Sequence, residues 1–126
     1  MSNLKTQNEN SNVKIRAYKF SLSIINFIGN LPNNKTYWVF SDQLLRSSTS
    51  IGANIVEASS SSSRREFVKY YEISLKSANE TKYWLCLLRD SNLVKVILIS
   101  PLLTEVTEIA KMLGSSVLTL KGKNKI

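Results

Sequence analysis

Hydrophobic residues recur at intervals of three and four along most of this chain, with polar residues between them. In the first stretch they fall at Val13, Ala17, Phe20, Ile24, Phe27 and Leu31. That spacing places them on one face of an α-helix, and three more apolar residues widen the stripe: Tyr18, Leu22 and Ile25. We expect the helix to end near Asn30, because Pro32 disfavours helical geometry in the residue before it.

A second helix is predicted after a short loop, with Asn34 or Thr36 as its cap. Its apolar side is formed by Tyr37, Phe40, Leu44, Ser47 or Ser48, Ile51 and Ile55. The middle, residues 47–53, is rich in Ser, Thr and Gly, which are poor helix formers. Small side chains also let a neighbouring backbone approach closely, so we interpret this stretch as a tight packing face and not as a break.

A third helix should begin at Ser63, because residues 63–66 match the capping box, in which a Ser and a Glu satisfy each other's backbone amides. Its stripe is Phe67, Tyr70 or Tyr71, Ser74, Ala78, Thr81, Leu85 and Leu88. The helix should stop around residues 91–92, because Asn92 tolerates the left-handed conformation found after helix ends.

Residues 93–99 are apolar without clear periodicity, and they predict either a connector packed on the bundle or a short strand-like edge. Ser100 is the expected cap of a fourth helix, with Pro101 at its first position. The fourth stripe is Leu103, Val106, Ala110, Leu113, Val117 and Leu120, with Leu102 and Ile109 beside it.

Four amphipathic helices joined by short loops predict an all-α, antiparallel up-down four-helix bundle over residues 13–120. A chain of 126 residues fits one such domain. We expect the Asn/Ser/Gln-rich residues 1–12 to be flexible and residues 121–126 to form a basic tail.

Charge and cysteine content narrow the possible partners. Lys and Arg number 17 against 9 Asp and Glu, a net charge of +8. A basic surface either serves only to keep the protein soluble or binds a polyanion.

Cys86, the only cysteine, lies in an apolar stretch and predicts a buried thiol in a reducing compartment. No apolar leader or membrane-spanning stretch is present, so we expect a cytoplasmic protein with no membrane partner.

Catalytic chemistry has little support in the sequence. There is no histidine, which removes the commonest general base and metal ligand. One cysteine cannot build a zinc site, and the glycine motifs of nucleotide-binding loops are missing. We therefore expect a protein that is not an enzyme, with no metal and no cofactor.

Basic residues on the second and third helices are the candidate nucleic-acid contacts: Arg46, Arg64, Arg65, Lys69 and Lys76. Lys69 and Lys76 are seven apart and therefore share one helix face. They would bind phosphates without reading sequence, or they are simply solvated. Several aromatic residues can stack on bases, although their helical spacing is also typical of a core: Tyr37, Trp38, Tyr70, Tyr71 and Tyr83.

The stretch from Gln43 to Glu57, QLLRSSTSIGANIVE, resembles the signature of the 23S rRNA intervening-sequence protein family. Glu66-Phe67 and residues 77–80 fall where that family has further conserved elements. The resemblance implies a four-helix bundle that assembles into a ring, usually a homopentamer. It also implies a link to RNA or DNA, since related accessory variability proteins of retroelements form basic barrels that associate with nucleic acid.

This chain departs from the family pattern at three positions. Ala58 and Lys76 stand where the family has Gly, and Ser61 stands where it has Arg. Lys76 therefore either points outward or widens a helix contact.

We interpret the signature itself as a packing device that fixes helix register or a subunit contact. Its polar residues need partners wherever they are buried, and they are Ser50, Asn54, Glu57, Ser77 and Glu80. We expect Asn54 and Glu57 to hydrogen-bond either Arg46 or the region of Ser77 and Glu80 on the third helix. The leading hypothesis is an oligomer that binds RNA or DNA through basic residues. The alternative is a scaffold or adaptor that binds another protein, with no direct nucleic-acid role.

Overall fold

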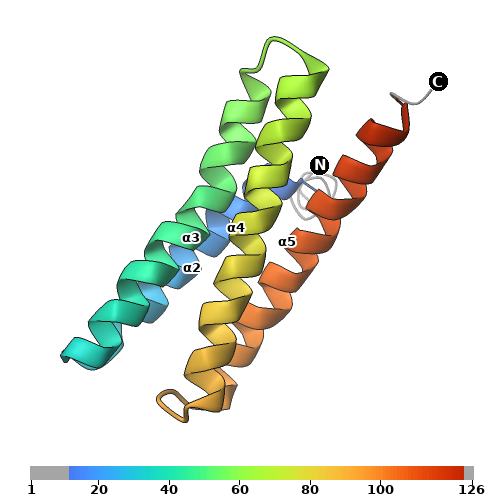
Figure 1. Cartoon of the computed structure of the whole chain (residues 1–126). Helices are drawn as coiled ribbons and strands as arrows, with labels where there is room; N and C mark the ends of the chain where they lie inside the picture. The colour runs from blue at the N-terminus through green and yellow to red at the C-terminus, as the bar shows by residue number, and fades with distance from the viewer. Residues whose placement is uncertain (1–11, 124–126) are drawn as a thin grey trace, which may run out of the picture.

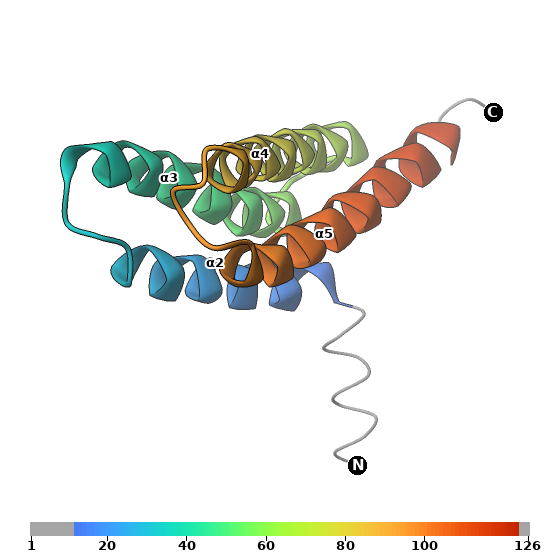
Figure 2. The same cartoon turned by 90° about the horizontal axis from the view of Figure 1, so that it is seen from below.

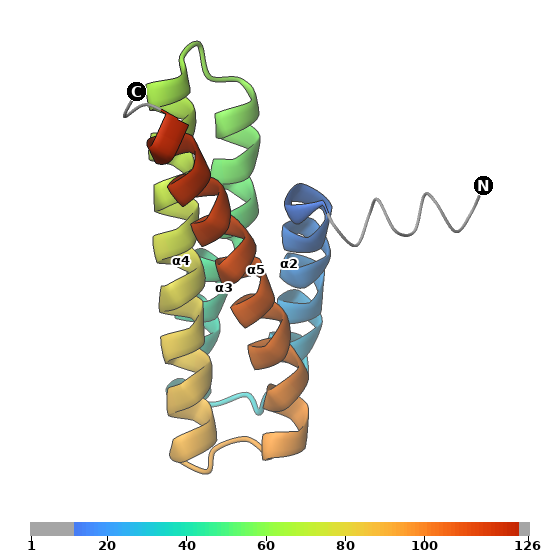
Figure 3. The same cartoon turned by 90° about the vertical axis from the view of Figure 1, so that its right-hand side faces the viewer.

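The structure, a computed structural model, describes residues 12–123 and contains four α-helices in this part of the chain. They are α2 (Val13–Gly29), α3 (Lys35–Ser59), α4 (Arg64–Asp90) and α5 (Val96–Lys123). Successive helices run antiparallel, and α5 returns to pack against α2 (Figures 1 and 3). The predicted all-α up-down bundle is therefore confirmed.

Two layers of helices build the bundle. Figure 2 shows α3 and α4 side by side in one layer and α2 with α5 in the other, with α5 crossing obliquely toward the start of α4. A two-pronged ion pair ties α2 to α5, because the Arg16 guanidinium donates to both carboxylate oxygens of Glu105 at 2.9 and 2.6 Å.

Polar side chains cap three of the helices. The side chains of Asn12, Asn34 and Ser63 accept backbone N–H bonds at the starts of α2, α3 and α4. Asn34, and not Thr36, is thus the cap of α3. At the end of α4, Asn92 has a φ of 61°, the left-handed conformation that the sequence predicted there.

The core follows the predicted stripes, with a shift at two points. Val68 takes the buried place in α4 that was predicted for Phe67. On α5, Leu102 and Ile109 are buried, while Leu103 and Ala110 are half-buried. The predicted positions Val106, Leu113 and Val117 are buried. Cys86 is half-buried, and not buried as predicted.

The predicted start of the last helix is wrong. α5 begins at Val96, so Pro101 lies inside the helix and Ser100 is not its cap. The Ser100 hydroxyl instead donates to the Val96 carbonyl at 2.9 Å. Proline is tolerated here because it removes only one bond, to the carbonyl four residues earlier, and that residue, Ile97, is 76% exposed.

The expected tail and flexible start fall partly outside the structure. α5 continues through residue 123, so the first three residues of the predicted tail are helical. Residues 1–11 and 124–126 lie outside the described part of the chain.

One end of the bundle is built from three helices. α2 has 17 residues, whereas the other helices have 25 to 28. Gly52 packs against Ala17 near the start of α2, so the last turns of α3 extend beyond α2 (Figure 3). We call this region, where α3 ends, α4 begins and α5 ends, the open end.

Candidate nucleic-acid interface

The α3–α4 contact is made by short hydroxyl side chains. We call it the hydroxyl seam, and it consists of Ser47, Ser50, Ser74, Ser77 and Thr81. Thr81 donates to the Ser47 hydroxyl at 2.9 Å, and Ser74 donates to the Ile51 carbonyl at 2.8 Å. Three of the five residues are fully buried, so the stretch predicted to be a tight packing face does lie inside a close helix contact.

Three of the signature residues form one hydrogen-bonded cluster on this seam. The Asn54 amide donates to the Ser50 carbonyl and hydroxyl at 2.8 and 3.0 Å. Ser77 reaches the same Ser50 hydroxyl from α4 at 3.0 Å. These contacts link the middle of α3 to the middle of α4.

Arg46 and Glu80 form a second link between α3 and α4. The Arg46 guanidinium pairs with the Glu80 carboxylate, which also accepts a bond from the Trp84 indole at 2.9 Å. The Trp84 hydrogen bond, followed by the Arg46 pair, lowers the pKa of Glu80. Glu57, in contrast, is exposed and makes no side-chain bond within residues 12–123.

The remaining predicted basic residues lie along α4. Lys76 is exposed in the middle of the helix and points outward. Arg64, Arg65 and Lys69 are exposed in its first two turns, at the open end. The structure therefore separates Arg46, which is held by Glu80, from the group at the start of α4.

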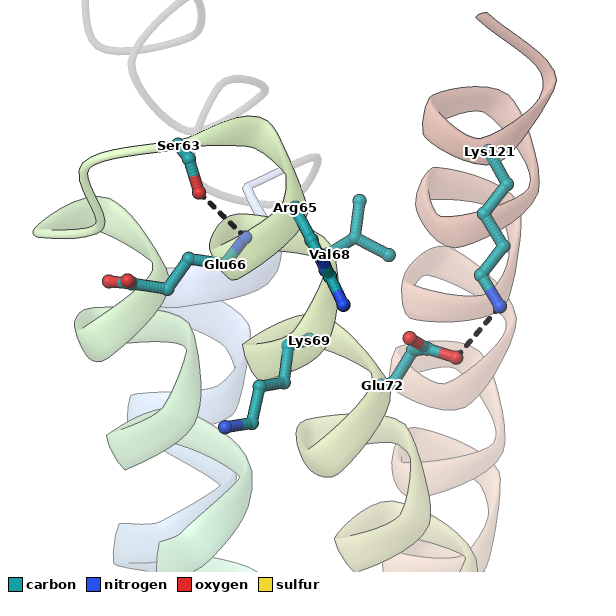
Figure 4. A pocket seen from close by; sticks show the side chains of 7 residues that line it. All are labelled: Ser63, Arg65, Glu66, Val68, Lys69, Glu72 and Lys121. Atoms are coloured by element: carbon teal, nitrogen blue, oxygen red, sulfur yellow. Dashed lines mark hydrogen bonds and ion pairs between the residues drawn. The ribbon is translucent and has the colours of Figure 1, made fainter. Parts of the chain in front are cut away.

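Two of these residues line a cavity of about 700 Å³ between α4 and α5, here called the basic pocket. Figure 4 shows Arg65 and Lys69 extending from α4 and Lys121 extending from α5. The other lining residues are Ser63, Glu66, Val68 and Glu72. Lys121 pairs with Glu72 at 2.9 Å, while the Glu66 carboxylate points away from Lys121 (Figure 4).

The basic pocket has the chemistry of an anion site. Three cations from two helices outnumber its two carboxylates. Sequence reasoning missed Lys121 because it was assigned to a tail. The signal that could have found it is the apolar stripe of α5, which runs to Leu120.

A different surface lies on α2 and α3 and is apolar. A groove of about 600 Å³ there is lined by Ile15, Tyr18, Leu22, Gly52, Ala53 and Val56, with Lys14, Lys19, Ser21 and Thr49 at its edges. Tyr18 is 67% exposed and Leu22 is 51% exposed. The residues predicted to widen the α2 stripe therefore face away from the core. We call this the α2–α3 face.

Metal and membrane sites are not found in the described chain. Residues 12–123 contain no group of three or more acidic or cysteine side chains that could hold a metal ion. None of the four described helices is long and apolar enough to cross a membrane.

These features define an all-α bundle protein with a seam of hydroxyls and a basic open end. Residues 9–115 match the model of the family described as 23S rRNA-intervening sequence protein. The chain belongs to this family, and neither that description nor the structural match below names an enzymatic activity.

A solved structure supports the same assignment. The chain is 40% identical to a protein of unknown function from the S23 ribosomal protein family of Bacteroides thetaiotaomicron VPI-5482, with a TM-score of 0.79. The match covers 84% of this chain and 98% of that one. No curated protein matches the chain.

Proposed function

We propose that this protein is a non-enzymatic cytoplasmic bundle that binds RNA or DNA through phosphate contacts at its open end. The observation that carries the proposal is that Arg65, Lys69 and Lys121 all line one pocket. Cations that neutralise phosphates release condensed counterions, which favours binding without any base contact. The net charge of +8 supports attraction of a polyanion from a distance.

A salt titration tests the proposal. Fluorescence anisotropy would follow a labelled structured RNA between about 50 and 200 mM salt. We expect Arg65→Ala and Lys69→Ala each to weaken binding and to reduce the log–log salt slope by about one. Lys35→Ala, which removes an equal charge at the other end of the bundle, is the matched control. Binding that ignores salt, or variants that match the control, would contradict the proposal.

Assembly of several copies is a second candidate function, favoured by the α2–α3 face. α2 buries Ala17, Phe20 and Ile24 on one side and exposes Tyr18 and Leu22 on nearly the opposite side. A helix that is apolar on both sides is typically covered on both. We propose that copies of the chain pack here into a ring, with the homopentamer as the expected size.

Light scattering coupled to gel filtration tests assembly. Leu22→Glu should shift a ring-sized particle toward the mass of one chain, because a charge would be buried at the contact. Leu118→Glu, at a 73% exposed position on α5, should leave the mass unchanged. If wild type runs as a single chain and recovers a protein partner after nuclease treatment, the adaptor alternative is favoured instead.

A further inference from the structure

The open end contains a second cavity system next to the basic pocket. At this end, α4 and α5 line an open cavity of about 350 Å³, here called the aromatic groove. It is lined by Phe67, Tyr71, Ser115, Ser116, Thr119 and Leu120. The rings of Phe67 and Tyr71 are stacked, with centroids 4.6 Å apart and planes 25° apart.

The aromatic groove and the basic pocket both lie at the start of α4. A third cavity, of about 420 Å³, lies between them over the α3–α4 turn. It shares Phe67 and Leu120 with the aromatic groove and Ser63 with the basic pocket. Arg64 lines it as well. A flexible ligand that reaches both sites would therefore pass around the start of α4, from the three cations to the two aromatic rings.

We propose that the aromatic groove binds an unpaired base of a single-stranded nucleic acid whose phosphates lie in the basic pocket. This inference rests on the proposed function and narrows it to one class of ligand. Aromatic rings beside a basic channel are the usual means of holding unpaired bases. In a duplex the bases are stacked on one another and cannot present their faces to these rings.

The other groups of the groove fit this ligand. The hydroxyls of Ser115, Ser116 and Thr119 both donate and accept hydrogen bonds, so they can pair with the edge of any base. The site should tolerate all four bases, because stacking depends little on base identity.

Anisotropy with matched oligonucleotides tests the inference. The probes are a labelled 12-nucleotide single strand, as RNA and as DNA, and the same strands annealed to their complements. We expect the single strands to bind at least about tenfold more tightly than the duplexes. Tyr71→Leu should weaken single-strand binding by about tenfold, since stacking is lost, and should leave the salt slope unchanged, since no phosphate contact is lost.

Two controls separate stacking from folding. Tyr71→Phe keeps the ring and should bind as wild type does, while Tyr83→Leu changes a 58% exposed tyrosine far along α4 and should have no effect. The inference is overturned if duplexes bind as tightly as single strands or if Tyr71→Leu behaves like the Tyr83 control. If Arg65→Ala still reduces a salt-dependent affinity in that case, the proposed function survives. If no probe binds at any salt, both fail.

Discussion

Small hydroxyl residues fill the contact between α3 and α4, where larger apolar side chains are common between helices. Ser74 is fully buried, and its hydroxyl donates to the Ile51 carbonyl of α3. Its short side chain is what allows α4 to lie so close to α3. A longer side chain here has no room unless the two helices move apart.

Ser74→Leu should therefore destabilise the fold by about 1–3 kcal/mol through overpacking. The measurement is the free energy of unfolding from urea denaturation followed by circular dichroism. Asn79→Leu, at an exposed position of the same helix, should change stability by less than about 0.5 kcal/mol. Equal effects from both variants would show that the seam is not closely packed.

Glu80 gives a pH-dependent prediction. The fold lowers the pKa of this carboxyl, so the charged form stabilises the protein. This stabilisation is fully present at a pH above the pKa of an ordinary glutamate. It is lost as the pH falls through the lowered pKa that Glu80 has in the folded protein. Glu80→Gln should cost at most about 1 kcal/mol at pH 7, because the pair is exposed to screening by water. The cost should shrink below about pH 4, where glutamates protonate.

Unfolding curves of wild type and Glu80→Gln at pH 7 and pH 3 would check this. Glu57→Gln is the control, since Glu57 has no side-chain partner within the described residues. A stability difference that stays constant across this pH range would contradict the assignment of the Arg46–Glu80–Trp84 contacts as its source.

Among the helices, α5 departs most from what its sequence predicts. Pro101 favours a helix start, yet the helix extends five residues before it, to Val96. The apolar run at 96–99 favours this extension because it places Ile99 in the core, where it is fully buried. Tertiary packing thus outweighs the local preference of proline, and this balance cannot be judged from one segment alone.

Pro101→Ala should consequently stabilise α5. The substitution supplies an N–H to the Ile97 carbonyl and removes the steric clash of the ring. We expect a gain of about 1 kcal/mol, reduced from the full helix penalty because proline also restricts the unfolded chain. Urea denaturation measures the gain, and amide exchange should show slower exchange in the first turns of α5. A loss of stability would mean that the proline fits the helix start better than its position suggests.

For the molecule as a whole, the sequence predicts the fold better than it predicts the site. The stripes and caps are encoded locally, so the four helices and most of the core are correctly predicted. The open end depends instead on differences in helix length, and the basic pocket depends on Lys121 lying beside Glu72. Such relations between distant segments have no local signal in the sequence. For the same reason the sequence places Arg46 and Arg65 in one candidate site, whereas in the structure Arg46 lies on α3 and pairs with Glu80, away from Arg65.

The Glu72–Lys121 pair leads to a prediction about binding strength. Glu72 neutralises one of the three cations of the basic pocket. Glu72→Gln should therefore strengthen RNA binding several-fold and steepen the salt slope, because Lys121 becomes available to a phosphate. Anisotropy measures the effect, with Glu108→Gln on the middle of α5 as the control for net charge. Unchanged or weaker binding would place the phosphates outside this pocket.

The hydroxyl seam also has a mechanical consequence. α3 and α4 are joined by a short turn and cross-linked at their middle by hydrogen bonds, so we expect them to behave as one stiff plate. α2 and α5 are attached to that plate mainly through apolar side chains, which can slide in small steps. A ligand that enters the open end would then be accommodated by movement of α5 against a fixed α3–α4 plate.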